Sequence, residues 1–403
     1  MLSKIKDMNY IIKFTDSYLE NIILNVCIFL FGINFLYKAN YILMVTFVLL
    51  VFFKKKKVKM GDIKSLVVLF LFFLSWSYFN DFEISGICMP LCYIIGCNVK
   101  EKADIKKLIY LLTFSLALYT TSFFINNAIV NGISNYDING QPNIWNGKLL
   151  WPTNIMLYSS LYMGLFGYFV FEEKKLIIKI LYFIIFGINA FYAMMLSRRA
   201  ALLMVIISIV CISVYTLLFN GKEKRKQFIK IMLVLICVGI VAFVVLYIMY
   251  KTNFYGFKEM VMRSDLYKRF IGHGDFMFFF NDMGRSVFRK RMLDHFWEYP
   301  FGGCYLREIA GNYAHDIWLD VYDVGGIIPF VFIVLYTLLF GKSIITLLTN
   351  KNVNKSIKLL LLCLSSCILA QCCIEPILEA CKAYMFALCM IHGLVDFILK
   401  EQL

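Results

Sequence analysis

The stretch GKEKRKQFIKIMLVLICVGIVAFVVLYIMY, residues 221–250, decides the fold class of this chain. It opens with a cluster of cations and continues as an almost wholly apolar run over 229–250. About 20 consecutive apolar residues give a helix the length that crosses the hydrocarbon core of a bilayer. Lys and Arg are concentrated in loops on the cytoplasmic side. The stretch therefore predicts a membrane-spanning helix whose N-terminal end faces the cytoplasm.

The composition of the whole chain has the same character. Of the 403 residues, 61% are hydrophobic and 17% are charged, whereas soluble domains are about half apolar and about a quarter charged. The N-terminal residues lack an apolar core followed by a small-residue cleavage site, so we expect the first apolar segment to be retained. The net charge of +15 is assigned to membrane topology, and no nucleic-acid partner is expected.

Apolar runs recur along the chain and predict about twelve transmembrane helices in a single membrane domain, residues 1–403. In lipid every backbone group must be paired internally, and the runs lack the alternating pattern of a membrane β-barrel, so the expected fold class is all-α. We expect Pro90 to break the segment 84–98, for which a re-entrant path is an alternative to a full span. The segments are 18–36, 39–53, 64–79, 84–98, 107–126, 153–171, 176–196, 200–219, 229–250, 325–347, 359–376 and 382–398.

The distribution of cations orients these segments. With a cytoplasmic N-terminus, most of the 41 Lys and Arg residues fall in cytoplasmic loops, among them the KKKKVK run at 54–59 and the run at 221–230. Both termini are then cytoplasmic. Two longer segments face outside, a first external loop at 127–152 and a long external loop at 251–324. We expect the long loop to be partly helical and to carry the active site.

The 13 cysteines indicate neither a metal centre nor a disulfide framework. They form no CxxC pair, and most lie in apolar runs, where Cys behaves as a small hydrophobe. Cys304 stands alone in the polar part of the long external loop. We expect neither a metal nor a cofactor.

Ser197-Arg198-Arg199 forms a very tight connection between two apolar segments on the predicted outer side. Charges at such depth are costly and often functional. The planar guanidinium of Arg binds phosphate through two parallel N–H bonds, so Arg198 and Arg199 are candidate anion ligands. The alternative is that both side chains extend to outer lipid headgroups.

Gly284-Arg285 opens a predicted amphipathic helix that ends before Pro300, because apolar residues recur there at a spacing near 3.6. Arg285 lies at the helix start, where free N–H groups add to an anion site. Arg289, one turn later, is a second candidate. An interfacial helix bound to anionic headgroups is the alternative, above all for Lys290 and Arg291.

His315 stands shortly before an apolar segment, in the stretch NYAHDIWLDVYDVGG. A neutral imidazole can accept a proton near neutral pH, which suits a general base. Asp316 follows it, although successive residues on a helix diverge by about 100° and Asp316 need not orient the ring. A capping or interfacial His is the alternative.

The first external loop, with the residues that follow it, reads NGISNYDINGQPNIWNGKLLWPTN up to Asn154. Its Asn and Gly residues favour turns, while its amides and aromatic rings suit contacts with sugars. An ordinary connecting loop is an equally good interpretation.

Three local patterns resemble the bacterial O-antigen polymerase and O-antigen ligase family, integral membrane proteins that build lipopolysaccharide, capsule and other surface polysaccharides. MLSRRAALL (195–203) is similar to the Ser-Arg turn of the family, and GRSVFRKRMLDHFWEYPFGGCY (284–305) to its Gly-Arg helix. AHDIWLDVYDVGGIIPFVF (314–332) is similar to its His-Asn stretch with Gly-x-x-Gly. Asp316 stands where the family often has Asn, and Pro329 where it has Gly.

The resemblance implies a metal-independent glycosyltransferase of the bacterial plasma membrane. Its substrates would be polyprenyl diphosphate-linked oligosaccharides, which meet at the outer face among membrane lipids, and a chain-length regulator and a flippase would be its partners. Arg198 and Arg285 would bind the diphosphate, and His315 would activate the acceptor hydroxyl. Arg199, Arg289, Asp316 and Asn154 are the expected substrate-binding residues.

Two other functions compete with a polymerase. A ligase of the same family would pass finished glycan to another acceptor. A transporter or flippase for a lipid-linked solute would place ionisable residues within its spans. Glu375 and Glu379, near a late external turn, are the only indication of transport in the sequence.

Overall fold

The computed structural model describes most of the chain. The predicted segment 39–53, the basic run 54–58, and parts of both predicted external loops (133–139 and 268–283) lie wholly or largely outside the described residues. The structure describes residues 22–36, 40, 42–43, 45–46, 59–80, 84–98, 102–132, 140–145, 147, 149–219, 221–264, 267 and 284–400.

The prediction of an all-α chain rich in membrane-length helices is confirmed. Within the described residues, eight helical segments are long and apolar enough to cross a membrane, and three shorter apolar helices cover Ile22–Gly32, α3 (Ile63–Phe79) and Ser85–Cys97. The long segments are α5 (Lys102–Asn131), α6 (Pro152–Met163) with α7 (Phe166–Phe171), α8 (Leu176–Met195), α9 (Arg199–Phe219), α10 (Lys222–Lys251), α16 (Ile327–Thr349), α17 (Lys355–Cys372) and α19 (Lys382–Lys400).

Pro90 does not break its segment, which corrects the expectation of an interruption there. It is the third residue of α4 (Cys88–Cys97) and follows a short 3-10 helix, η2 (Ile84–Ile87). In the first helical turn the missing N–H of proline has no partner to lose. With 10 residues, α4 has about half of the length that crosses a bilayer.

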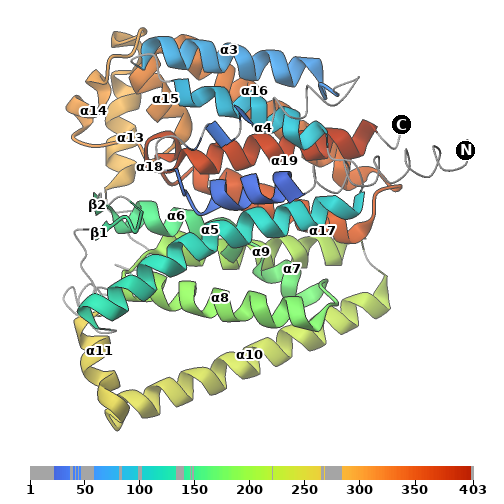
Figure 1. Ribbon diagram of the computed structural model, residues 1–403, viewed down its shortest axis with the longest axis vertical. Coiled ribbons are helices and arrows are strands. Elements are labelled where there is room, and N and C mark those ends of the chain that lie inside the picture. The colour runs from blue at the N-terminus through green and yellow to red at the C-terminus, as the bar shows by residue number, and fades with distance from the viewer. Residues whose placement is uncertain are drawn as a thin grey trace, which may run out of the picture.

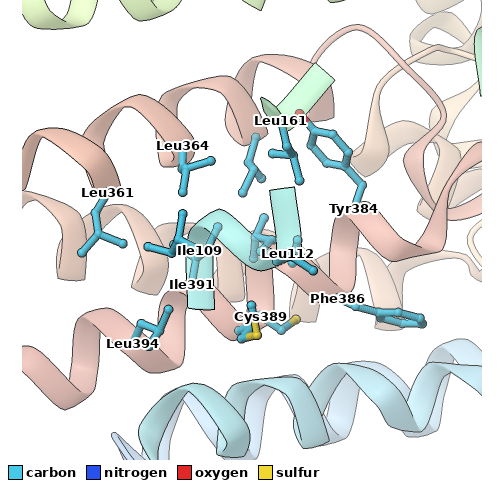
Figure 2. Close-up of a cluster of buried hydrophobic side chains, with 14 of the residues drawn as sticks. Ile109, Leu112, Leu161, Leu361, Leu364, Tyr384, Phe386, Cys389, Ile391 and Leu394 are labelled. Atoms are coloured by element: carbon cyan, nitrogen blue, oxygen red, sulfur yellow. The ribbon is translucent and has the colours of Figure 1, made fainter. Parts of the chain in front are cut away.

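The core lies around α19. Leucine, isoleucine and aromatic side chains from α5, α6, α17 and α19 point toward one another there (Figure 2). On its other side α19 packs against α4, where a Cβ at Gly393 would overlap the Tyr93 carbonyl oxygen and a Cβ at Gly96 would overlap that of Met390. Small residues let two helix backbones approach in this way, as is common in membranes.

Several loops predicted to be cytoplasmic meet at one end of the bundle. Lys106 of α5 donates to Ser356 Oγ at 2.8 Å, and Lys355 pairs with Glu172 at 3.1 Å. Lys400, at the end of α19, donates to the Gly61 carbonyl before α3. These contacts join the start of α17 to the start of α5 and to the end of α7, and the end of α19 to the chain just before α3.

The opposite end carries the short elements of the two predicted external loops (Figure 1). Gln141–Pro142 (β1) and Leu149–Leu150 (β2) form an antiparallel pair. After α10 come η3 (Phe254–Gly256), α11 (Phe257–Arg263), α13 (Arg285–Asp294), η5 (Phe296–Glu298), α14 (Tyr305–Ala310) and α15 (Ile317–Gly325), and α18 (Ile377–Ala380) lies between α17 and α19. In Figure 1, β1, β2, α11, α13, α14 and α18 lie on the left, away from the C-terminal end of α19.

Backbone hydrogen bonds join two glycine-containing turns after α13. Gly303 N–H donates to the Val324 carbonyl at 3.1 Å, and Ile327 N–H donates to the Pro300 carbonyl at 2.9 Å. Gly326 has φ 74 and ψ −159, a conformation that is essentially restricted to glycine. The turn that ends the α13 region is therefore fixed to the junction of α15 and α16.

We predict that Gly326→Ala destabilises the protein by at least about 3 kcal/mol, because strain at φ 74 adds to overlap of the new Cβ with the Pro300 carbonyl oxygen. Gly311→Ala is the matched control, since Gly311 has φ 84 and open space around a Cβ, and it should cost about 1–2 kcal/mol. Thermal unfolding in detergent measures both. Equal losses would contradict the role of the Pro300 contact.

Candidate functional site

Arg285 begins α13 and reaches the loop that follows α17. The helix starts after Gly284, which adopts φ 84 as the N-cap. Arg285 Nη1 donates to the Ile374 carbonyl at 2.6 Å, and Nη2 pairs with Glu375 Oε1 at 3.2 Å. The predicted anion ligand is therefore paired with a carboxylate, and 29% of its side chain is exposed.

Arg289 lies one turn further along α13 and holds the His315 loop. Its Nε donates to the Ala314 carbonyl at 2.9 Å, and Nη2 donates to the His315 carbonyl at 2.8 Å and also to the Cys373 carbonyl. A single guanidinium thus bridges the loop before α15 and the loop after α17. The contacts of Arg289 position other parts of the site.

His315 occupies a strained backbone position. Its φ of 56 is unusual for a residue with a side chain, and such outliers cluster at functional sites. Its Nδ1 faces Glu375 Oε2 at 3.9 Å. Both atoms are buried, and within the described residues neither has a hydrogen-bond partner. An unpaired buried polar group costs about 1–3 kcal/mol, so this pair is a source of local strain.

Glu375 is the central residue of the site, although the sequence indicated it only as a sign of transport and not as a partner of Arg285 and His315. It lies between α17 and α18, before Pro376, and its side chain is 3% exposed. One carboxylate oxygen pairs with Arg285 and the other faces His315. The buried amide of Gln371, one turn earlier, also lacks a hydrogen-bond partner among the described residues. The sequence feature that could have identified Glu375 is the position of an acidic residue in a short turn on the same predicted side of the membrane as the arginines.

Asp316 has a structural role that accounts for its position. Its side chain caps α15 by accepting from Trp318 N at 3.1 Å and Leu319 N at 2.9 Å. Its Oδ2 lies 3.8 Å from Arg289 Nε. Burial raises the pKa of Asp316, while the two N–H bonds and Arg289 oppose that rise. Asp316 therefore fixes the start of α15 directly after His315.

Arg307 of α14 forms a second cluster that sequence reasoning also missed. It pairs with Asp323 of α15 through Nε and with Glu379 of α18 through Nη2 at 2.9 Å. It also lies over the Tyr313 ring at 4.5 Å. Burial alone would lower the pKa of Arg307, but hydrogen bonding to Asp323 and the charge of Glu379 raise it. These contacts tie α14, α15 and α18 together.

Asp320 is a buried carboxyl between the two clusters. Its Oδ1 accepts from Ala314 N at 2.9 Å, and its Oδ2 has no hydrogen-bond partner in the described part of the chain. Burial raises its pKa to about 8, with further contributions from the charges of Asp316 and Glu379. Asp320 is therefore largely protonated near neutral pH.

This raised pKa predicts a pH-dependent effect of Asp320→Asn. The folded pKa of about 8 exceeds the ordinary value of 3.8, so the native protein loses stability as pH rises between these values, by up to about 1.4 kcal/mol per unit. Asparagine removes that loss. The variant should be more stable than the native protein at pH 8, and the difference should shrink at pH 5. Parallel thermal unfolding curves with the same pH dependence would contradict the prediction.

The turn with Arg198 contacts a different part of the bundle. Ser197 has φ 53, and Arg198 N–H donates to the Ala193 carbonyl at 2.8 Å, which closes the connection between α8 and α9. Arg198 Nη1 donates to Thr153 Oγ1 at 2.9 Å, in the first turn of α6 beside the half-buried Asn154. Arg199 is the first residue of α9. The contacts thus place Arg198 beside Thr153 at the start of α6, and Arg285 and Arg289 beside the loops that carry Glu375 and His315.

α6 contacts elements that belong to both sets of residues. It packs against α9, which begins with Arg199, and against α18, which follows Glu375. Described residues of the predicted first external loop also contact the bundle, where Asn143 donates to the Tyr119 hydroxyl at 2.6 Å and Trp145 Nε1 donates to the Ile33 carbonyl at 3.0 Å. The loop is therefore anchored to α5 and to the chain after Gly32.

The donor set of the site consists of guanidinium, imidazole and carboxylate groups. In the ranges that the structure describes, no group of three or more His, Cys, Asp and Glu side chains is arranged to hold a metal ion. The arginine side chains can bind an anion, and the His315 imidazole can accept a proton. No protein-family model and no curated protein matches the sequence, so the chemistry of these residues is the basis for a function.

Proposed function

We propose that the chain is a polymerase of lipid-linked oligosaccharide repeat units. It transfers a glycan from a polyprenyl diphosphate carrier to a sugar hydroxyl at the outer face of the bacterial plasma membrane. The observation that carries this proposal is the chain of contacts from Arg285 through Glu375 to His315, at one end of a bundle of membrane-length helices. It combines an anion ligand with a proton acceptor.

The reaction assigns a role to each group. The acceptor hydroxyl oxygen attacks the anomeric carbon of the donor, and the bond from that carbon to the diphosphate oxygen breaks. His315 takes the hydroxyl proton, and arginine N–H groups stabilise the charge on the departing diphosphate. Arg198 and Arg285 are the proposed diphosphate ligands, with Arg199 and Asn154 beside the first. Arg289 and Asp316 hold the His315 loop and contribute to substrate binding through it.

Exposed aromatic side chains on the same segments support a sugar substrate. Trp145 and Trp151 in the first external loop are 44% and 60% exposed, and Trp297 after α13 is 75% exposed. Sugar rings stack on such surfaces, although exposed Trp also anchors proteins at the membrane interface. Trp151 directly precedes α6, whose Thr153 contacts Arg198, and Trp297 follows α13, which begins with Arg285, so we favour the sugar role.

The proposed membrane arrangement has twelve spans. The eight long segments and three shorter apolar helices are joined by segment 39–53, with both termini in the cytoplasm. Loops 127–152 and 251–324 then face outside with the candidate site. Lipid-linked donor and acceptor reach this site from the outer leaflet, a flippase delivers the repeat units, and a chain-length regulator is the expected partner.

The surface glycans of a deletion strain, resolved by length, test the proposal. Accumulation of single-repeat glycans on the lipid carrier is the expected result. Long polymer that remains unattached would instead identify a ligase of the same chemistry. Unchanged glycans would contradict both enzymes.

One observation favours transport as a second candidate function. His392 and Asp396 of α19 lie inside a membrane-length helix, where Asp396 accepts from Ser343 at 3.0 Å and from Tyr93, and His392 Nε2 lies 3.3 Å from Ser343 Oγ. Ionisable groups within spans often mark transport pathways. A structural role in joining α4, α16 and α19 explains the same contacts, and glycan extension by purified protein without a gradient would exclude transport as the primary activity.

A further inference from the structure

The pairing of Glu375 leaves two buried atoms unsatisfied. Its Oε1 is held by Arg285 at 3.2 Å, while Oε2 and His315 Nδ1 face each other at 3.9 Å. Neither of these facing atoms has a hydrogen-bond partner within the described residues. A hydrogen bond needs about 2.9 Å, so a shift of the carboxylate by roughly 1 Å would satisfy both atoms. Glu375 thus faces one partner on each carboxylate oxygen, and of these two only Arg285 is within hydrogen-bond distance.

The exposed fraction of each side chain decides which member of the Arg285–Glu375 pair an incoming substrate can reach. The Arg285 side chain is 29% exposed, whereas that of Glu375 is 3% exposed. A diphosphate approaching Arg285 carries more charge than one carboxylate and offers several oxygens to the planar guanidinium. The diphosphate therefore competes with Glu375 for Arg285. A displaced Glu375 cannot reach water from its buried position, and the unsatisfied His315 Nδ1 lies 3.9 Å from its Oε2.

We propose that Glu375 is a positioning residue that couples donor binding to the activation of His315. Binding of the lipid diphosphate to Arg285 releases Glu375, which then accepts a hydrogen bond from His315 Nδ1–H. This bond fixes the tautomer in which Nε2 is free to take the acceptor proton. The donor must therefore bind before the base is ready, and until then the Arg285–Glu375 pair keeps His315 inactive. This inference rests on the proposed function of the site.

Glu375→Gln separates the two roles of the carboxylate, because they affect binding and turnover in opposite directions. Loss of the competing charge should tighten the binding of farnesyl diphosphate in detergent micelles about tenfold. Loss of the carboxylate that orients His315 should slow turnover at saturating substrate about 10- to 100-fold. The substrate for turnover is lipid-linked oligosaccharide extracted from the deletion strain. A purely structural role would not give tighter binding with slower turnover.

Three further variants define the controls. Glu379→Gln makes the same charge change four residues away, at a residue that pairs with Arg307, and should leave farnesyl diphosphate binding unchanged. Glu375→Asp keeps the charge and should recover part of the turnover. In an Arg285→Ala background, Glu375→Gln should no longer tighten binding, because the competition is then absent. Thermal unfolding of each variant checks that it is folded.

The outcomes separate failure of this inference from failure of the proposed function. Unchanged or weaker binding by Glu375→Gln, or tighter binding with normal turnover, would overturn the switch and leave a diphosphate-binding site in place. No binding of farnesyl diphosphate to the native protein would overturn the proposed donor class and the switch together.

Discussion

His315→Ala is expected to abolish glycan extension, with a loss of about 10²- to 10⁴-fold, the usual contribution of a general base. The effect should fall on turnover and not on the amount of protein, because the described structure gives the imidazole Nδ1 no hydrogen bond to lose. The loop around it is held through backbone atoms by Arg289. Membrane fractions should then contain lipid-linked single repeats in place of polymer.

His315→Asn is the better matched variant for the same prediction. Asparagine tolerates a left-handed backbone well, so it suits the φ of 56 at this position, and its amide cannot act as a base. It should match His315→Ala in glycan length and exceed it in thermal stability. Polymer of normal length from either variant, at normal protein level, would remove His315 from the reaction.

Arg285→Ala and Arg198→Ala are each expected to shorten the polymer sharply. One lost donor to a developing negative charge costs about 3–4 kcal/mol, or about 10²- to 10³-fold in rate. Arg285→Ala also leaves Glu375 buried without its cation, which adds a stability loss of about 3–5 kcal/mol. Arg285→Lys keeps the charge but loses the planar fork. It should therefore lose less stability than Arg285→Ala while its rate of glycan extension stays low, which separates the two effects.

Arg291→Ala supplies the control for these arginines. Arg291 lies on the same helix and donates to the Ala310 carbonyl at 3.2 Å, and we expect it to face lipid headgroups. Polymer length in this variant should be close to that of the native protein. Full-length polymer from both Arg198→Ala and Arg285→Ala would contradict the assignment of a diphosphate donor.

The helices were largely predictable because they depend on local properties of the chain. The apolar runs in the described residues became helices, although 153–171 is divided into α6 and α7. The apolar spacing after Gly284 predicted α13 with its first residue at Arg285, but the helix ends at Asp294 and not directly before Pro300. Pro90 was misjudged, since a proline breaks a helix only beyond its first turn and the run itself does not show where the helix begins. The turn at Pro300 was predicted, but its contact with Gly326 was not.

The candidate site was predictable only in part. Arg285, Arg289 and His315 stand out because they are polar residues beside apolar runs, and the structure brings them together. Glu375 and Arg307 could not be assigned in the same way, since helical periodicity shows which face a residue occupies and not which distant helix covers it. Their partners lie on elements far apart in the sequence. For Arg198, the hydrogen bond to Thr153 places it beside α6, a contact that the tight turn alone did not indicate.

Extension of a lipid-linked oligosaccharide by the purified protein is the most direct test of the proposed polymerase. The protein in detergent, with EDTA present and no ion gradient, is incubated with the single-repeat lipid-linked glycan from the deletion strain. Stepwise longer glycans on the lipid carrier, with release of polyprenyl diphosphate and loss of both in His315→Asn, are the predicted result. Glycan that stays at one repeat with folded native protein would contradict it.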